Sequence, residues 1–108
     1  MLIIDESTFR SQVQLALTPL RGKVRSVTGP GRSGAIASVY ASHFLGVPWL
    51  PATEKIPDKL QPVLVVDTAV NSGATLRKLA KKRGADLAIA FFSEPPRVKF
   101  WYELEEKP

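Results

Sequence analysis

The sequence of 108 residues contains no cysteine and a single histidine, His43. The lack of cysteine excludes disulfides, thiolate catalysis and cysteine-based zinc sites, and one histidine cannot make a histidine-rich metal site. No apolar run approaches the roughly 20 residues that cross a bilayer. The chain starts with Met1 and soon reaches Asp5 and Glu6, unlike a secretory signal. We therefore expect a cytoplasmic protein with no membrane span.

The composition is that of a globular chain with an excess of positive charge. Hydrophobic residues make up 44% and charged residues 23%, which is too apolar for a disordered chain. No linker, repeat or low-complexity block interrupts the sequence, so we expect residues 1–108 to form one domain. Fifteen Lys and Arg stand against ten Asp and Glu, a net charge of +5. This balance favours a polyanionic ligand, and leaves both phosphates and nucleic acid open.

Hydrophobic spacing predicts strands that alternate with helices. Ser7 is the expected N-cap of a first amphipathic helix, which stops before Pro19. Further helices are predicted at 34–45 and 76–83, and strands at 24–28, 47–50, 63–66, 87–92 and, at a sheet edge, 98–102. The β-branched run at 63–66 is typical of a strand covered on both faces. The sequence therefore predicts a three-layer α/β/α fold around a mainly parallel, twisted sheet of four to five strands.

Two loops, at residues 29–34 and 67–75, each follow a predicted strand and open a predicted helix. Free backbone N–H groups and the helix dipole can bind an anion at such a place. In the second loop Ser72 and Thr75 add hydroxyl donors, and in the first loop Arg32 can hold a phosphate through two parallel hydrogen bonds. Either loop alone fits a plain tight turn equally well. Together they indicate a ligand with phosphates at both ends.

The stretch from Val63 to Thr75 resembles the phosphoribosyl pyrophosphate motif of type I phosphoribosyltransferases. That motif has four apolar residues, two acidic residues, a short loop with Ser/Thr-Gly and a closing Thr. The segment Gly29-Pro30-Gly31-Arg32-Ser33-Gly34 is similar to the family's pyrophosphate loop and follows the first core strand. The resemblance covers residues 23–92. It implies a phosphoribosyltransferase-like fold and a magnesium-dependent transfer of the phosphoribosyl group to a nucleobase or similar nitrogen acceptor, with release of pyrophosphate.

The resemblance also implies a role for each matched residue. Asp67, Thr68 and Arg32 form the catalytic set, in which Asp67 holds the ribose hydroxyls and, together with the substrate, Mg²⁺. The implied ligands of the 5′-phosphate are Ala69, Val70, Asn71, Ser72, Gly73, Ala74 and Thr75. Those of the pyrophosphate are Gly31, Arg32, Ser33 and Gly34, with the amides of Ser33 and Gly34 as donors. A strained cis peptide at Gly31-Arg32 is a further feature that the family often carries.

Two features depart from the family's pattern. Thr68 stands where the family has a second acidic residue, and a hydroxyl contributes no charge to the reacting sugar. Residues 51–62 form a shorter cover than the family's, and their Lys55 and Lys59 either reach the pyrophosphate or, as we favour, are solvated. These departures keep a second function open. The chain is then a non-catalytic regulatory module that binds phosphoribosyl pyrophosphate or a nucleotide, in association with RNA.

Residues outside the motifs also allow two interpretations. Phe100, Trp101 and Tyr102 could stack on a base, but in an edge strand they favour core or dimer contacts, and we expect a homodimer. His43 is expected to pack or to form a hydrogen bond rather than to act as an acid or base. Glu103 and the acidic residues after it are interpreted as solubility features.

The strongest charge cluster follows the second loop. Five basic residues without an acidic neighbour make it up: Arg77, Lys78, Lys81, Lys82 and Arg83. Such a stripe can neutralise the phosphates of a nucleic acid. It can equally be a solvated outer helix face with cations near the helix C-terminus, and the sequence favours this interpretation.

Overall fold

The computed structural model describes residues 1–53, 55–85 and 87–103. The strands are β1 (Leu2–Ile4), β2 (Ser26–Thr28), β3 (Val63–Val70), β4 (Leu87–Ser93) and β5 (Val98–Phe100). The helices are α1 (Glu6–Leu17), α2 (Gly31–Leu45) and α3 (Ala74–Lys82). Single 3₁₀ turns lie at Thr18–Leu20, Asp58–Leu60 and Trp101–Glu103. None of the helices in these ranges is long and apolar enough to cross a membrane.

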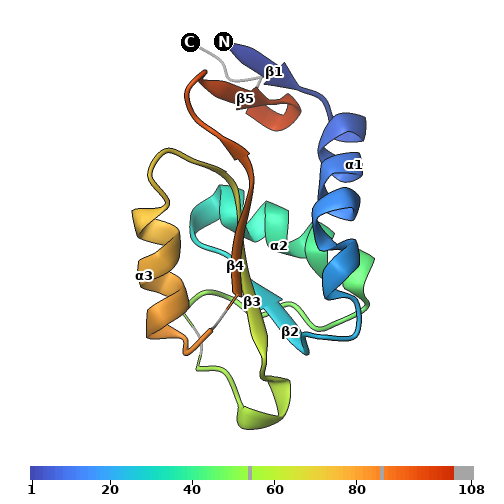
Figure 1. The fold of residues 1–108 in the computed structure, drawn as a ribbon, viewed down its shortest axis with the longest axis vertical. Coiled ribbons are helices and arrows are strands. Elements are labelled where there is room, and N and C mark those ends of the chain that lie inside the picture. The colour runs from blue at the N-terminus through green and yellow to red at the C-terminus, as the bar shows by residue number, and fades with distance from the viewer. Residues whose placement is uncertain (54, 86, 104–108) are drawn as a thin grey trace.

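The main sheet is parallel, in the order β2-β3-β4. Helix α3 covers one face, and α1 and α2 cover the other (Figure 1). Residues Val63 to Val66 of β3 are buried because both faces are covered. The predicted three-layer α/β/α fold is therefore confirmed, although this sheet has three strands where four to five were expected.

The predicted strand at 47–50 is reduced to one bridge. Trp49 pairs in parallel with Val27, on the side of β2 away from β3. After β2 the chain thus passes along one edge of β2, at Trp49, and then crosses to the opposite edge of β2, where it forms β3. The order of the sheet reverses between β2 and β3, which is where ligands bind in open parallel sheets.

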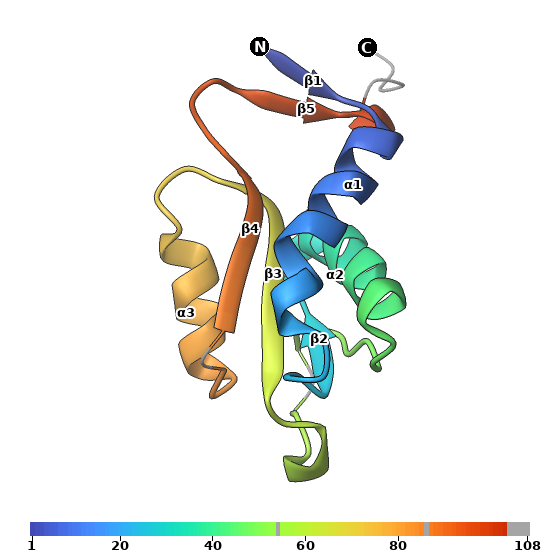
Figure 2. The same ribbon diagram turned by 45° about the vertical axis from the view of Figure 1, so that its right-hand side comes forward.

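A second, two-stranded sheet lies beyond the carboxyl end of the main sheet (Figure 2). In it β1 pairs in parallel with β5, from Leu2 opposite Val98 to Ile4 opposite Phe100. We call β1, β5 and the 3₁₀ turn at Trp101–Glu103 the hood. The edge strand predicted at 98–102 is confirmed over Val98–Phe100, and it pairs with β1, a strand that the sequence analysis missed.

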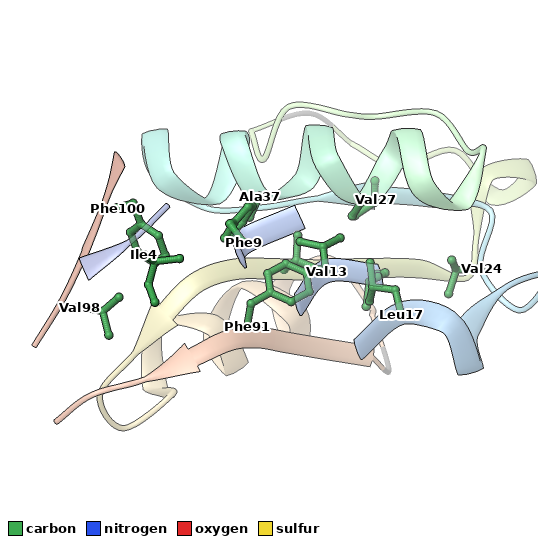
Figure 3. Packing of buried hydrophobic residues seen from close by; sticks show 13 residues of the cluster. Ile4, Phe9, Val13, Leu17, Val24, Val27, Ala37, Phe91, Val98 and Phe100 are labelled. Carbon is green, nitrogen blue, oxygen red and sulfur yellow. The ribbon is translucent and has the colours of Figure 1, made fainter. Parts of the chain in front are cut away.

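Aromatic rings join the hood to the rest of the molecule. Phe9 of α1 is fully buried, and its ring centroid lies 5.7 Å from those of Phe91 and Phe100 and 5.5 Å from that of Trp101. Figure 3 shows the core around it, to which α1, α2, both sheets and Val24 contribute. Because Phe100 and Trp101 belong to the hood, the same cluster that stabilises the sheet also holds the hood above it.

Two helix starts differ from the prediction. Asp5, not Ser7, caps α1: its Oδ1 accepts a hydrogen bond from the Thr8 N–H at 2.8 Å. Helix α2 begins at Gly31 instead of 34, since the Gly34 N–H already donates to the Pro30 carbonyl at 2.9 Å. The predicted pyrophosphate loop is therefore the first turn of α2.

Candidate functional site

Two helix N-termini meet at the carboxyl end of the main sheet. Helix α2 follows β2 and helix α3 follows β3, and these parallel strands are neighbours. The N-cap residues Pro30 and Gly73 provide no side-chain hydrogen bond, and neither first turn contains an acidic residue. The positive dipole ends of both helices are thus open to an anion, and of the first amides of α3 only the Ala74 N–H has a side-chain partner within residues 1–53, 55–85 and 87–103, namely Ser72 Oγ at 3.3 Å.

Glycine allows α2 to start directly against the sheet. A Cβ on Gly29 would collide with the carbonyl oxygens of Gly34 and Val66, and one on Gly34 would lie 2.6 Å from Pro30 Cδ. Because the Gly34 N–H is bonded to the Pro30 carbonyl, the N–H groups that precede the first intrahelical bond are those of residues 31–33. Of the two predicted amide donors, only that of Ser33 lies at the open end.

The Gly31-Arg32 peptide bond is not cis in this structure, contrary to expectation. The cis bonds of the described residues all precede proline, at Gln61-Pro62, Glu94-Pro95 and Pro95-Pro96.

Three hollows form a row across this end of the sheet. The phosphate hollow, of about 250 Å³, is lined by Asp67 and residues 69–76. The central hollow, of about 410 Å³, is lined by Ser33, Asp67, Thr68, Ala69, Glu94, Arg97, Val98, Phe100 and Glu103. The outer hollow, of about 220 Å³, is lined by Arg32, Ser33, Ile36, Tyr102 and Glu103. Neighbouring hollows share lining residues, so the row is continuous from the start of α3 to the start of α2.

Asp67 lies where the phosphate and central hollows meet, in β3 and not in a loop. Its Oδ1 accepts a hydrogen bond from the Thr68 N–H at 2.7 Å. Burial raises the pKa of the Asp67 carboxyl above its ordinary value, while the bond from Thr68 lowers it. Thr68 is only 4% exposed and also lines the central hollow. The structure thus brings together the two residues at the acidic positions of the motif.

The loop before α3 forms the wall of the phosphate hollow. All seven residues from Ala69 to Thr75 line it. Ser72 Oγ accepts a hydrogen bond from the Ala74 N–H at 3.3 Å, and the Ser72 carbonyl accepts one from Arg77 Nη1 at 3.1 Å. Gly73 has a φ of +79°, and a Cβ there would lie 2.9 Å from Arg77 Nη1. Arg77, which the sequence analysis placed only in the basic cluster, therefore braces the loop.

Two carboxylates at the site, one from the hood and one from the segment between β4 and β5, have a role that the sequence analysis missed. Glu94 Oε2 accepts a hydrogen bond from the Val98 N–H at 2.9 Å, and Glu103 Oε1 accepts one from the Phe100 N–H at 3.0 Å. Both glutamates line the central hollow. The interpretation of Glu103 as a solubility feature is wrong. No sequence signal marked these residues, because their position depends on the pairing of β5 with β1.

Tyr102 connects the hood to the start of α2. Its hydroxyl shares a hydrogen bond of 3.0 Å with Ser33 Oγ. Burial raises the pKa of Tyr102, as do the nearby charges of Glu103 and Asp67, while the hydroxyls of Ser33 and Thr68 lower it. The Tyr102 ring stacks on Phe100 with a centroid distance of 5.7 Å. One face of the Tyr102 ring is therefore covered by Phe100, and Tyr102 presents its hydroxyl to the site.

Other predicted residues lie away from the row. Trp101 packs against Phe9 and, at 6.1 Å, against Tyr40, so it has the core role that the sequence favoured. Lys55 and Lys59 are exposed and line none of the three hollows. His43 is exposed on α2, contrary to the expected packing role.

The donor set of the site fits a magnesium ion that arrives with its substrate. Among the residues that the structure describes, no group of three or more His, Asp or Glu side chains could hold a metal by itself. Mg²⁺ in proteins is commonly held by one or two carboxylates together with substrate phosphates. Asp67, between the phosphate and central hollows, is the carboxylate suited to that arrangement.

No protein-family model and no curated protein matches the chain. Solved structures do resemble it. The Helicobacter pylori xanthine-guanine-hypoxanthine phosphoribosyltransferase superposes with a TM-score of 0.74 at 17% sequence identity, over 96% of this chain and 93% of that one. The chain has the phosphoribosyltransferase fold.

Two further structures share this phosphoribosyltransferase fold with the chain. The Pyrococcus horikoshii purine phosphoribosyltransferase superposes with a TM-score of 0.69 at 20% identity, over 100% of this chain and 97% of that one. A hypothetical protein from Neisseria gonorrhoeae with bound ppGpp superposes with a TM-score of 0.70 at 15% identity, over 97% and 91%.

Proposed function

We propose that the protein is a magnesium-dependent phosphoribosyltransferase. It transfers the phosphoribosyl group of phosphoribosyl pyrophosphate to a nucleobase or similar nitrogen acceptor and releases pyrophosphate. One observation carries the proposal: a continuous row of hollows joins two helix N-termini that have no acidic residue in the first turn, and passes Asp67 between its phosphate and central hollows. A sugar with a phosphate at one end and a pyrophosphate at the other matches that row in charge and in order.

Each end of the substrate has a matching set of donors. The 5′-phosphate binds in the phosphate hollow, to the hydroxyls of Ser72 and Thr75 and the first amides of α3. The pyrophosphate binds at the outer hollow, to Arg32 and the first amides of α2. Asp67 then faces the ribose hydroxyls between them.

The reaction needs charge stabilisation more than a covalent nucleophile. A nitrogen lone pair of the acceptor forms a bond to the anomeric carbon, and the electrons of the carbon–oxygen bond leave with pyrophosphate. Positive charge develops on the sugar, near the half-buried Asp67, and negative charge develops on the pyrophosphate, near Arg32. Bound Mg²⁺ supplies further charge neutralisation on the pyrophosphate oxygens. The acceptor lies in the central hollow, under the hood.

A second function is favoured by Thr68. This side chain is buried at the central hollow and brings a hydroxyl where the motif has a carboxylate. The similar fold of a protein with bound ppGpp, a nucleotide with phosphates at two positions, also fits binding without turnover. The alternative is a regulatory module that binds phosphoribosyl pyrophosphate or a nucleotide.

Calorimetric titration of phosphoribosyl pyrophosphate, with and without Mg²⁺, tests the binding. We expect micromolar affinity for the wild type and loss of binding for Ser72→Ala/Thr75→Ala. The matched control is Ser7→Ala/Ser11→Ala, which removes two exposed hydroxyls from α1 and should bind like the wild type. A wild type that binds no phosphoribosyl pyrophosphate in either condition contradicts the transferase, and one that also binds no nucleotide in the same titration contradicts the regulatory module.

Release of pyrophosphate with a panel of bases separates the two functions. Turnover by the wild type supports the transferase. If the wild type binds but does not turn over, while Thr68→Asp gains turnover without gaining affinity, the regulatory module is correct.

A further inference from the structure

Helix α3 carries an unbalanced positive face. Arg77, Lys78, Lys81 and Lys82 are all exposed. Arg77 and Lys81 are one turn apart, as are Lys78 and Lys82, so the four cations lie in two adjacent columns. No acidic residue occurs between residues 71 and 83. The face therefore presents four positive charges to solvent without a negative one between them.

This arrangement does not serve the stability of the helix. Like charges one turn apart repel each other, and Arg77 lies in the first turn of α3, where the dipole disfavours cations, while Lys78 lies at the middle of the helix, where the dipole gives no support. Within the described ranges, the ion pair that forms joins Arg10 and Glu6 of α1, so no ion pair relieves α3. The sequence favoured the interpretation that these cations support the C-terminus of the helix. That interpretation accounts for Lys81 and Lys82 alone.

A hollow runs beside this face, between α3 and β4. It has a volume of about 430 Å³ and is lined by Arg77, Ala80, Lys81, Gly84, Ala85 and Ala88. Four of these residues are Gly or Ala, so a large ligand can approach the backbone closely at this hollow. The side chains of Arg77 and Lys81 then lie beside that ligand. Helix α3 is also the outermost layer on its side of the sheet (Figure 1). Nothing else in the described part of the chain covers this surface.

We infer that this face of α3, with the adjacent hollow, binds the phosphodiester backbone of double-stranded nucleic acid. Single strands are bound through aromatic side chains that stack on bases, and residues 71–90 contain no aromatic residue. A membrane surface is disfavoured because the apolar residues Leu76 and Ala80 are buried in the fold and leave no apolar face to insert. The regularly spaced phosphates of a duplex are contacted by lysine and arginine alone, so duplex binding requires neither aromatic side chains that stack nor an apolar face that inserts.

The inference is independent of the proposed function. Lys78 and Lys82 line none of the three hollows of the candidate site. Their replacement therefore tests the face and leaves the binding of phosphoribosyl pyrophosphate in place.

Fluorescence anisotropy with a labelled 20-base-pair duplex, prepared as RNA and as DNA, tests the inference across a salt series. Four phosphate contacts predict that log K falls with log salt at a slope of about −3.6 for DNA. The variant Lys78→Gln/Lys82→Gln should lose at least tenfold in affinity at low salt and show about half that slope. The matched control, Lys23→Gln/Arg25→Gln, removes the same charge from exposed positions before β2 and should bind like the wild type.

Each other outcome overturns the inference. Equal losses in both variants mean that only net charge matters. If single-stranded oligonucleotides or anionic phosphatidylserine vesicles bind more tightly than either duplex, the face binds another kind of partner. In the Lys78→Gln/Lys82→Gln variant, relief of repulsion offsets the support that Lys82 gives to the helix C-terminus, so its melting temperature should stay within a few degrees of the wild type. An unchanged melting temperature shows that a loss of affinity is not a loss of fold.

Discussion

The start of α1 differs from the starts of α2 and α3. Helix α1 has an acidic N-cap, Asp5, whose carboxylate bonds to the Thr8 N–H, and Glu6 lies in its first turn. Helices α2 and α3 begin after Pro30 and Gly73, which provide no side-chain hydrogen bond, and neither helix has an acidic residue in its first turn. At α3 a neutral hydroxyl, Ser72 Oγ, accepts from the Ala74 N–H. The helix with a carboxylate cap starts beside the hood strand β1, whereas the two helices without one start at the carboxyl end of the main sheet.

This difference separates groups that stabilise the fold from groups that remain available for a ligand. A carboxylate at a helix N-terminus stabilises the helix and also occupies the place that an anion would take. The chain uses this stabilisation in α1 and omits it in α2 and α3. The following changes test this division, in order of decreasing expected effect.

Gly29→Ala should be the most damaging change. The added Cβ meets the carbonyl oxygens of Gly34 and Val66, so α2 can no longer start against β3. We expect a loss of about 3 kcal/mol or more in the free energy of unfolding, measured by urea denaturation. As a control, Gly31→Ala meets no atom and should cost only the strain of its φ of +63°, about 1–2 kcal/mol. Equal losses for the two variants would refute the close-packing argument.

Ala74→Glu gives α3 the kind of acidic first turn that α1 has. We expect the free energy of unfolding to rise by about 0.5 kcal/mol through the helix dipole. Affinity for phosphoribosyl pyrophosphate should fall at least tenfold in calorimetry, because the new carboxylate repels the phosphate. Ala74→Gln, which has the same shape without the charge, should change affinity much less. A variant that is more stable and binds normally would contradict the division.

Asp5→Ala removes the cap of α1. We expect the melting temperature to fall by a few degrees, while calorimetry shows unchanged affinity for phosphoribosyl pyrophosphate. The hydrogen bond from Thr8 lowers the pKa of Asp5 below 3.8. The stabilisation by Asp5 is therefore present above pH 3.8 and lost as the pH falls through the lowered pKa. If the wild type and variant melt at the same temperature at pH 7, Asp5 is not a stabilising cap.

The Asp67 carboxyl should contribute a pH dependence of stability opposite to that of Asp5, and Asp67→Asn should have the smallest effect on stability. Burial raises the pKa of Asp67 above 3.8, so the folded state binds the proton more tightly than the unfolded state. The wild type should lose stability as the pH rises from 3.8 through the raised pKa, and the variant should not. Thermal melts at pH 3 and pH 7 compare the two proteins. A variant that is less stable than the wild type at pH 7 would show that the Asp67 carboxylate serves the fold.

Local patterns predicted the parts of the fold that local forces determine. The valine-rich run at 63–66 and the helical spacing after it located β3 and α3. The order of strand, loop and helix was correct for both units, but both loops are shorter than predicted, since residues 31–34 belong to α2, residues 67–70 to β3 and residues 74–75 to α3. The length of β3 was underestimated, because Asp67 and Thr68 look like loop residues but pair with β4 through Asp67 opposite Ala90. Ser7 and Asp5 are both good caps, and only the backbone geometry shows that Asp5 is the one used.

The sequence by itself determined the strand–loop–helix units and the residues that can meet phosphates, because periodicity, glycine and helix N-termini act over a few neighbouring residues. Only the tertiary structure decided the hood. Strand β1 has three residues and obtains its hydrogen bonds from β5 at the other end of the chain, so no local pattern marks it. That pairing, together with the packing of Phe9 against Phe100 and Trp101, is what brings Glu94, Glu103 and Tyr102 to the site.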